Sequence, residues 1–325
     1  MPRSPLLALV VLAGAALVAA HDDCFVQTID YVTGVNRVRF LGKSPNFQIF
    51  PNTSLDGYLQ LRFFKLQELT AANQAVTNHS VTSFAAAAPT WTAANTSVNG
   101  VSFTLVRLTL DPTTFNGFDT ACPSTSGRRA LHESEEAAGA GRALLQTTVT
   151  PTPLVTLSLY FGNANSATFP YGNNKTETIP AGSVKVTVEY SNWPFCNVNN
   201  TLSLEIDLLL KGDAAAKPIA SSSTDGTKYL TISLGNGTVC GIRHTTYAYE
   251  GISGVRSLPV GVSINNTNTT STMVLKLPNP APNSSVYYDL TVVSNIILIV
   301  PGSAAGVRVT LWTLAAAVLL SVFMS

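Results

Sequence analysis

The sequence predicts an all-β protein made of two antiparallel β-sandwich-like domains joined by a charged flexible linker. Apolar and polar residues alternate with a period of two in many short segments, which is typical of strands with one buried face. The residues between these segments are rich in Gly, Pro, Asn and Ser, as in turns between antiparallel strands. No interior segment keeps the 3.6-residue apolar period of a major helix.

Residues 1–20 match a secretory signal peptide. A basic residue, Arg3, precedes an apolar run from Leu6 that ends in the small residues Ala19 and Ala20. The run holds about 15 residues, fewer than the roughly 20 that a membrane-spanning helix needs. We therefore expect cleavage after Ala20, so that the mature chain begins at His21.

The first β domain is expected at residues 21–123. Two of its strands, 57–66 and 100–110, change phase: the apolar positions move from odd to even residues at Phe64 and at Val106. A β-bulge would produce such a change, and so would a strand that is buried on both faces. Asn99-Gly100 indicates a turn, and residues 85–97 are expected to form an exposed loop.

The flexible linker is expected at residues 124–149, and all of its charged residues lie between Gly127 and Gln146. Ala, Glu and Arg favour helix there, but Gly139 and Gly141 interrupt it. One interpretation is a solvated connection between domains. The other is a processing segment that is cut in an exposed loop at the basic residues, namely Arg128, Arg129 and Arg142.

The linker also repeats an Arg-Ala-Leu motif, as "RRALH" and then "GRALLQ". These tags resemble the Arg-Arg-Ala-Leu-Leu-Gln tags of secreted proteins from volvocine green algae, among them extracellular-matrix glycoproteins such as the pherophorins. The resemblance is confined to residues 127–146, and the cysteine-rich signature and proline rod of the pherophorins are absent. It implies a secreted cell-surface or matrix glycoprotein.

The second β domain, a sandwich, is expected at residues 150–301. The alternation is regular in five segments: 184–190, 202–210, 230–234, 273–277 and 286–292. A continuous apolar run, Ile296 to Val300, suggests a final strand that is covered on both sides. Asn236-Gly237 indicates a turn, and residues 214–227 are expected to form an exposed loop.

Residues 302–325 match the attachment signal of a glycosylphosphatidylinositol (GPI) anchor. Small residues from Gly302 to Gly306 precede an apolar tail that reaches Met324. We expect the lipid to be attached at Gly302 or Ser303, which places the protein on the outer leaflet of the plasma membrane. A short transmembrane helix is the alternative, although no Lys or Arg follows the tail to anchor a cytoplasmic end.

The secreted chain has four cysteines and nine N-glycosylation sequons. Two disulfides are expected from Cys24, Cys122, Cys196 and Cys240, with three possible pairings. We favour Cys24–Cys122 and Cys196–Cys240, one in each half, and no Cys-x-x-Cys suggests zinc. The sequons predict glycans on surface loops, at Asn52, Asn78, Asn95, Asn174, Asn199, Asn236, Asn265, Asn268 and Asn283.

Few residues suggest catalysis, and no cofactor is expected. The common hydrolase, zinc-protease and phosphate-loop motifs are absent from the sequence. The carboxylates of Glu189, Glu205 and Asp207 could act as a glycosidase pair, but they fall on polar strand faces. A copper site of the kind found in lytic polysaccharide monooxygenases would need the mature N-terminal His21 and a second ligand, His244. The other histidines, His79 within a sequon and His132 in the linker, are expected to be exposed.

The function expected from these patterns is adhesion, recognition, or a structural role in the cell wall or matrix. The net charge of +1 gives no reason to expect nucleic acid as a partner. The alternatives are a copper oxidase that acts on polysaccharide and a lectin-like module whose exposed rings stack on sugars. The rings considered for stacking are Trp91, Trp193, Tyr247 and Tyr249.

Overall fold

The structure is a computed structural model that describes most of the chain between residues 28 and 294. The described residues are 28–32, 36–42, 44–50, 57–82, 84, 91–123, 151–171, 175–211, 219–222, 228–235, 238–251, 256–267, 270–282 and 284–294. The predicted signal peptide, linker, final strand and anchor signal lie outside these ranges. Among the described residues, no helix is both long and apolar enough to cross a bilayer.

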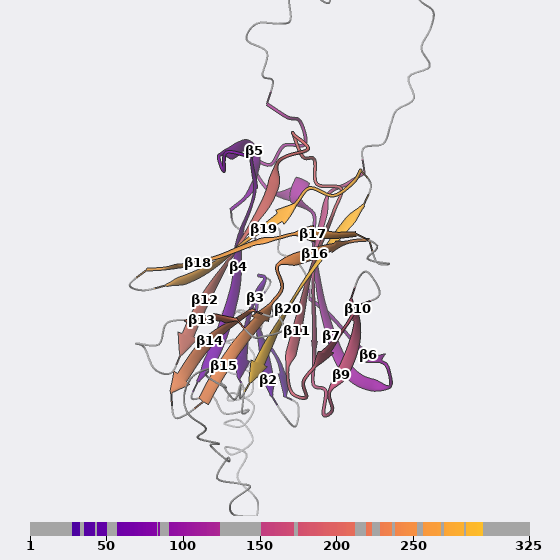
Figure 1. Cartoon of the computed structure of the whole chain (residues 1–325), viewed down its shortest axis with the longest axis vertical. Coiled ribbons are helices and arrows are strands. Elements are labelled where there is room, and N and C mark those ends of the chain that lie inside the picture. The colour runs from indigo at the N-terminus through magenta and orange to yellow at the C-terminus, as the bar shows by residue number, and fades with distance from the viewer. Residues whose placement is uncertain are drawn as a thin grey trace, which may run out of the picture. The chain divides into compact units, whose positions relative to one another are not determined.

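The all-β, antiparallel, sandwich-like class is confirmed (Figure 1). Sheet A joins its strands in the order β1-β2-β3-β4-β12-β19-β18, and β5 pairs with β4. Its strands are β1 (Thr28–Val32), β2 (Arg37–Leu41), β3 (Asn46–Phe50), β4 (Tyr58–Leu69), β5 (Ala75–Val81), β12 (Thr201–Lys211), β18 (Gly261–Asn266) and β19 (Ser271–Pro278).

Sheet B joins its strands in the order β13-β14-β15-β20-β11-β8-β7-β6, and β16 pairs with β20 and with β17. Its strands are β6 (Thr92–Val98), β7 (Val101–Leu110), β8 (Leu154–Phe161), β11 (Val184–Ser191), β13 (Ile219–Ser222), β14 (Lys228–Gly235), β15 (Thr238–His244), β16 (Tyr247–Glu250), β17 (Arg256–Pro259) and β20 (Ser285–Ser294). A separate hairpin consists of β9 (Ala167–Tyr171) and β10 (Lys175–Ile179).

The strands are distributed differently from the expected one-domain-per-half arrangement. Each sheet takes strands from both sides of the linker: β4 pairs with β12 in sheet A, and β7 pairs with β8 in sheet B. Figure 1 shows the first pair as an indigo strand beside a salmon one. Residues 123 and 150 therefore do not separate two independent sets of sheets.

One hydrophobic core is shared by the two sheets. Phe40, Leu61 and Leu204 of sheet A belong to the same cluster of buried side chains as Leu159 and Val188 of sheet B. A hydrogen bond from the Tyr190 hydroxyl to the carbonyl of Pro278 also crosses between the sheets. Burial of apolar area against a common core, at roughly 25 cal/mol per Å², thus depends on both halves of the chain.

The phase change in β4 is a β-bulge. Lys65 is opposite Glu205 and Phe63 is opposite Ile206, so Phe64 has no partner on β12. Before the bulge the odd residues face the core; after it the even residues do, and Leu66 and Glu68 become buried.

The phase change in β7 has the other predicted cause, burial on both faces. The register of β7 with β6 and with β8 is unbroken. Val106 packs in the main core, whereas Phe103, on the opposite face, packs under the β9–β10 hairpin with Phe169 and Ile179.

The turn predicted at Asn99-Gly100 connects β6 and β7, and both residues have positive φ, 49° and 81°, as a two-residue hairpin turn requires. Two expected loops contain strands instead. Residues 92–97 belong to β6 and residues 219–222 form β13, because each finds an antiparallel partner at a sheet edge.

Candidate functional site at the Cys122–Cys196 disulfide

Cys122 and Cys196 form a disulfide that connects the two sides of the linker. Their Cα atoms are 5.3 Å apart, within the usual range for a disulfide. The favoured pairing within each half is therefore wrong for these residues. It assumed that each half folds by itself, whereas the shared sheets bring the segment after β7 beside the segment before β12.

Cys240, the expected partner of Cys196, is a free thiol in β15 and is buried in the core. Burial raises the pKa of this thiol to about 12, so the neutral form, which is unreactive, predominates. Cys24 lies outside the described residues.

Behind the disulfide lies a buried carboxylate, Glu68, which the bulge at Phe64 turns toward the interior. One of its oxygens accepts hydrogen bonds from the backbone N–H of Cys196, at 2.8 Å, and from the side-chain amide of Asn200, at 2.5 Å. The other oxygen lies 2.7 Å from Nδ1 of His79. Three polar groups thus surround this one carboxylate.

His79 was expected to be exposed, and this prediction is wrong: its side chain is fully buried. The pairing of β5 with β4 is irregular here, and Asn78 takes a positive φ of 62°, which asparagine tolerates better than most residues. This irregularity leaves Asn78 exposed and turns His79 inward toward Glu68.

Both ring nitrogens of His79 face acceptors. Nδ1 faces the Glu68 carboxylate, and Nε2 lies 3.2 Å from the carbonyl oxygen of Ala121. Because a neutral imidazole carries one N–H only, two acceptors call for the doubly protonated, cationic ring. With the ring in this form, Glu68 and His79 are a buried ion pair.

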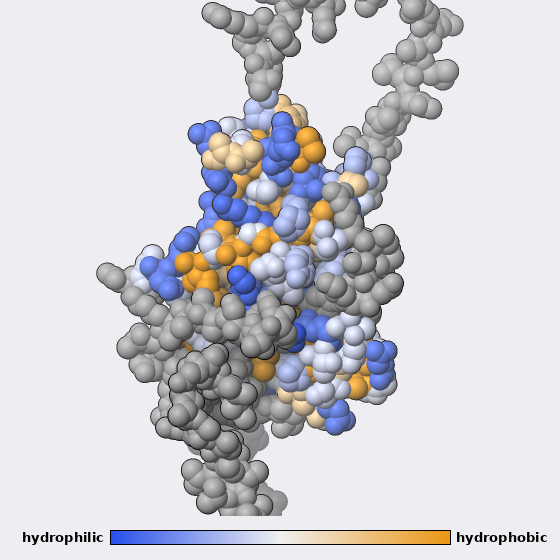
Figure 2. All heavy atoms as spheres, viewed as in Figure 1, coloured by the Kyte–Doolittle hydropathy of each residue, from blue (hydrophilic) through white to orange (hydrophobic). Residues whose placement is uncertain are grey.

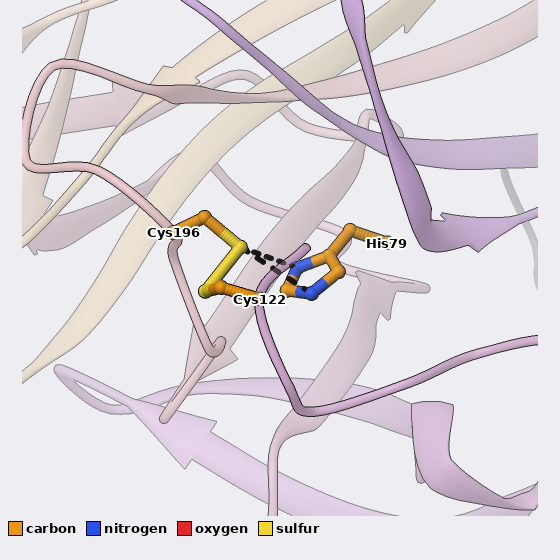
Figure 3. Close-up of side chains that lie close together, drawn as sticks. All are labelled: His79, Cys122 and Cys196. Atoms are coloured by element: carbon orange, nitrogen blue, oxygen red, sulfur yellow. Dashed lines mark hydrogen bonds between the residues drawn. A yellow bond between two sulfur atoms is a disulfide. The ribbon is translucent and has the colours of Figure 1, made fainter. Parts of the chain in front are cut away.

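The cationic ring lies against the disulfide (Figure 3). The sulfur of Cys196 is 3.4 Å from Nε2 and 3.7 Å from Nδ1 of His79. One atom from each of His79, Cys122 and Cys196 lies within 4.8 Å of the others. This grouping is not a set of metal ligands, because metals bind the thiolate form of cysteine and both sulfurs are joined to each other.

A shallow groove of about 400 Å³ lies beside the disulfide. Its walls come from the segment before β12 and the segment after β19, and they include Trp193, Phe195, Val198, Pro280 and Pro282. The Trp193 ring is buried, and its indole N–H has no partner among the described residues.

The three predicted carboxylates do not come together. Glu205 and Asp207 lie on the outer face of sheet A, where they pair with Lys65 and Arg62. Glu189 lies on the outer face of sheet B, since its neighbours Val188 and Tyr190 face the core. The body of the sandwich separates Glu189 from the other two. Glu205 and Asp207 share one face of β12, but each is ion-paired with a basic side chain, so neither is presented as a free general acid or base.

His244, the proposed second copper ligand, is buried, and its Nδ1 has no partner among the described residues. Its pKa is lowered, chiefly by burial. The first proposed ligand, His21, is outside the described residues, so the structure does not test the pair.

Three of the four aromatic residues considered for sugar stacking are buried instead: Trp91, Trp193 and Tyr249. Tyr247 is exposed. Other large exposed apolar side chains lie on separate elements, for example Ile29 on β1 and Leu154 on β8. On the face drawn in Figure 2, hydrophobic and hydrophilic residues are interspersed.

The sequon asparagines that the structure describes are all exposed. They are Asn78, Asn95, Asn199 and Asn265. The other predicted acceptors, Asn52, Asn174, Asn236, Asn268 and Asn283, lie outside the described residues, as do Arg128, Arg129, Arg142, Gly302 and Ser303. In two sequons the middle residue, His79 or Asn200, points inward and binds Glu68.

The fold and the site together define an antiparallel β-sandwich protein with a buried ion pair beside a disulfide that spans the linker. Comparison with known families and with curated proteins found no match to this chain.

Proposed function

We propose that this is an N-glycosylated cell-surface protein, held by a GPI anchor at Gly302 or Ser303, that acts in adhesion, recognition or the structure of the cell wall or matrix. The observation that carries the proposal is the exposure of all four described acceptor asparagines, which lie on or next to both sheets. The disulfide also fits an oxidising, extracellular location.

The competing enzyme class has less support. Of the candidate carboxylates, Glu189 lies on the other sheet from Glu205 and Asp207, and these two are ion-paired with Lys65 and Arg62. Three of the four candidate stacking rings are part of the packed interior. What remains on the surface is a broad, mixed face with sites for glycans, which suits a scaffold or a recognition surface better than a catalytic cleft.

The test is release of the protein from intact cells by phosphatidylinositol-specific phospholipase C. We expect the enzyme to move the protein into the aqueous phase, and peptide N-glycosidase to lower the mass of the released form. The released protein should also bind purified wall or matrix material. Retention at the membrane would contradict the anchor, and unmodified asparagines would contradict the glycoprotein.

The same released material separates the alternatives. Stoichiometric copper, detected by electron paramagnetic resonance, would favour the oxidase that uses His21 and His244. Binding to defined sugars on a glycan array, in place of wall material, would favour the lectin-like module.

A further inference from the structure

We propose that Cys122–Cys196 is a site of thiol–disulfide exchange, in which an external dithiol attacks Cys122 and Cys196 leaves as a thiolate beside the His79 cation. The inference needs only the described residues around the disulfide and does not depend on the anchor or the glycans.

The two sulfurs differ in access. Cys122 lies in an exposed segment, whereas Cys196 is half-buried and its sulfur backs onto the His79 ring (Figure 3). Exchange requires a thiolate to approach one sulfur while the other departs. The solvent side of the bond therefore offers Cys122 for attack and leaves Cys196 as the departing atom.

The surroundings of Cys196 stabilise negative charge on its sulfur. The ring nitrogens of His79 lie at 3.4 and 3.7 Å from that sulfur, and the N–H bonds of the ring are directed to Glu68 and to Ala121. The ring therefore acts on the sulfur by its charge, as the cationic end of the Glu68–His79 pair, and not by donating a hydrogen bond to it. A neighbouring histidine cation lowers the pKa of a cysteine, and a leaving thiol of lower pKa departs faster.

The ion pair holds the cation in place. Glu68 is fixed by the backbone of Cys196 itself and by Asn200, so the carboxylate, the ring and the sulfur belong to one hydrogen-bonded unit. Phe118 covers the ring from the side, with ring centroids 6.0 Å apart. His79 contacts the reacting sulfur, while Glu68 acts as a positioning residue.

The exchange balances with a dithiol as the co-reactant. Its first thiolate forms a bond to Cys122 Sγ, the Cys122–Cys196 bond breaks, and the electron pair stays on Cys196. Its second thiolate then attacks the mixed disulfide and releases Cys122, which takes a proton from water. The dithiol is oxidised by two electrons to a disulfide, and the protein is reduced by two.

The deciding experiment uses the native full-length protein and a monothiol, glutathione, which has no second thiol to release itself from Cys122. The Cys196 thiolate can still expel it, so the mixed disulfide is trapped by alkylation of that thiolate. After alkylation with iodoacetamide at about pH 5, where ordinary thiols are protonated and unreactive, peptides are mapped by mass spectrometry. We expect glutathione on Cys122 and the alkyl group on Cys196. Glutathione mainly on Cys196, or no reaction before unfolding, would overturn the proposal.

A variant tests the role of the His79 ring in the exchange. His79→Gln should slow reduction by dithiothreitol by about tenfold, because the leaving thiolate loses its cation, and alkylation of Cys196 should then need alkaline pH. His244→Gln replaces another buried histidine and should leave the rate unchanged. If His79→Gln does not fold, the position of glutathione in the wild-type protein still shows which of the two sulfurs is attacked. An equal rate in folded His79→Gln would refute the role of the ring.

Discussion

Two buried charged clusters in this protein are held in different ways. The first, Glu68 with His79, is assembled from both sides of the linker and is fixed by the backbone at Cys196. The second, Lys185 with Asp289, comes from the neighbouring strands β11 and β20 on the outer face of sheet B. Both are nearly inaccessible to water.

The second cluster is buried by an added layer. The Lys185 ammonium lies 5.6 Å from the ring centre of Tyr160 and 5.3 Å from that of Phe169, which belongs to the β9–β10 hairpin. Its nitrogen also donates to the Thr187 hydroxyl at 2.7 Å. The alternation of residues 184–190 predicts one buried face only, but the hairpin covers the other face, on which Lys185 lies.

In both clusters the buried charge is tolerated because donors or acceptors surround it, whether these belong to the core or to a covering layer. Removal of one partner from such a pair leaves the other charge buried and uncompensated. The clusters should differ in how easily the remaining charge can reach water.

The largest loss of stability is expected for Glu68→Gln. The change leaves the His79 cation without its counter-ion in a fully buried position, and we expect the free energy of unfolding to fall by about 3–5 kcal/mol. Urea denaturation measures it. Glu205→Gln, which removes the partly exposed partner of Lys65, is the matched control and should cost below about 1 kcal/mol. Similar losses in the two variants would contradict the buried ion pair.

A smaller loss of stability is expected for Asp289→Asn. The long Lys185 side chain can reach water if the β9–β10 hairpin shifts, so we expect a loss of about 1–3 kcal/mol. Replacing both partners, as Lys185→Met with Asp289→Leu, should recover most of it, since an apolar pair has no charge to desolvate. A double variant that is less stable than Asp289→Asn would show that the ion pair itself stabilises the fold.

His244 is a further buried histidine, and it has no ion-pair partner among the residues that the structure describes. Its folded-state pKa lies below the ordinary 6.5, chiefly because of burial, so the unfolded chain binds more protons as the pH falls. The stability that the neutral ring contributes is complete above pH 6.5 and is lost as the pH falls from there through the lowered pKa. The loss cannot exceed about 1.4 kcal/mol per pH unit for one proton.

Unfolding midpoints in urea between pH 7 and pH 5 measure this loss. His244→Gln should flatten the pH dependence, since the variant has no group to titrate at that position. An unchanged slope in this variant would assign the pH dependence to another group.

The sequence predicted the class of fold and most of its strands because alternation is a local property. Residues 184–190 and 202–210 were predicted as strands from their own pattern, and both are strands. The pairing of β4 with β12 was not predictable in this way, since it joins residues far apart in the chain. The disulfide pairing depends on that topology.

The candidate site was missed for a related reason. The phase change at Phe64 is visible in the sequence. If the even-residue phase continues for two residues beyond Leu66, it places Glu68 on the buried face. His79 gave no such signal, because its burial depends on the irregular pairing of β5 and on the positive φ of Asn78. A sequon indicates the exposure of its asparagine only, not of its middle residue.

The smallest effect on stability is expected from a cut in the linker. Such a cut tests whether the Glu68–His79 cluster needs a continuous chain. Glu68 and His79 precede the linker, whereas Cys196 and Asn200 follow it. If the processing sites at Arg128, Arg129 or Arg142 are cut, the disulfide and the β4–β12 and β7–β8 pairings still hold the fragments together.

Limited trypsin digestion of the native protein provides the measurement. We expect two fragments on a reducing denaturing gel, one species on the non-reducing gel, and a single peak in native gel filtration even after reduction. The nicked protein should keep the same loss of stability on Glu68→Gln as the intact protein. Separation of the fragments in gel filtration without denaturant would mean that the shared sheets do not hold the halves together.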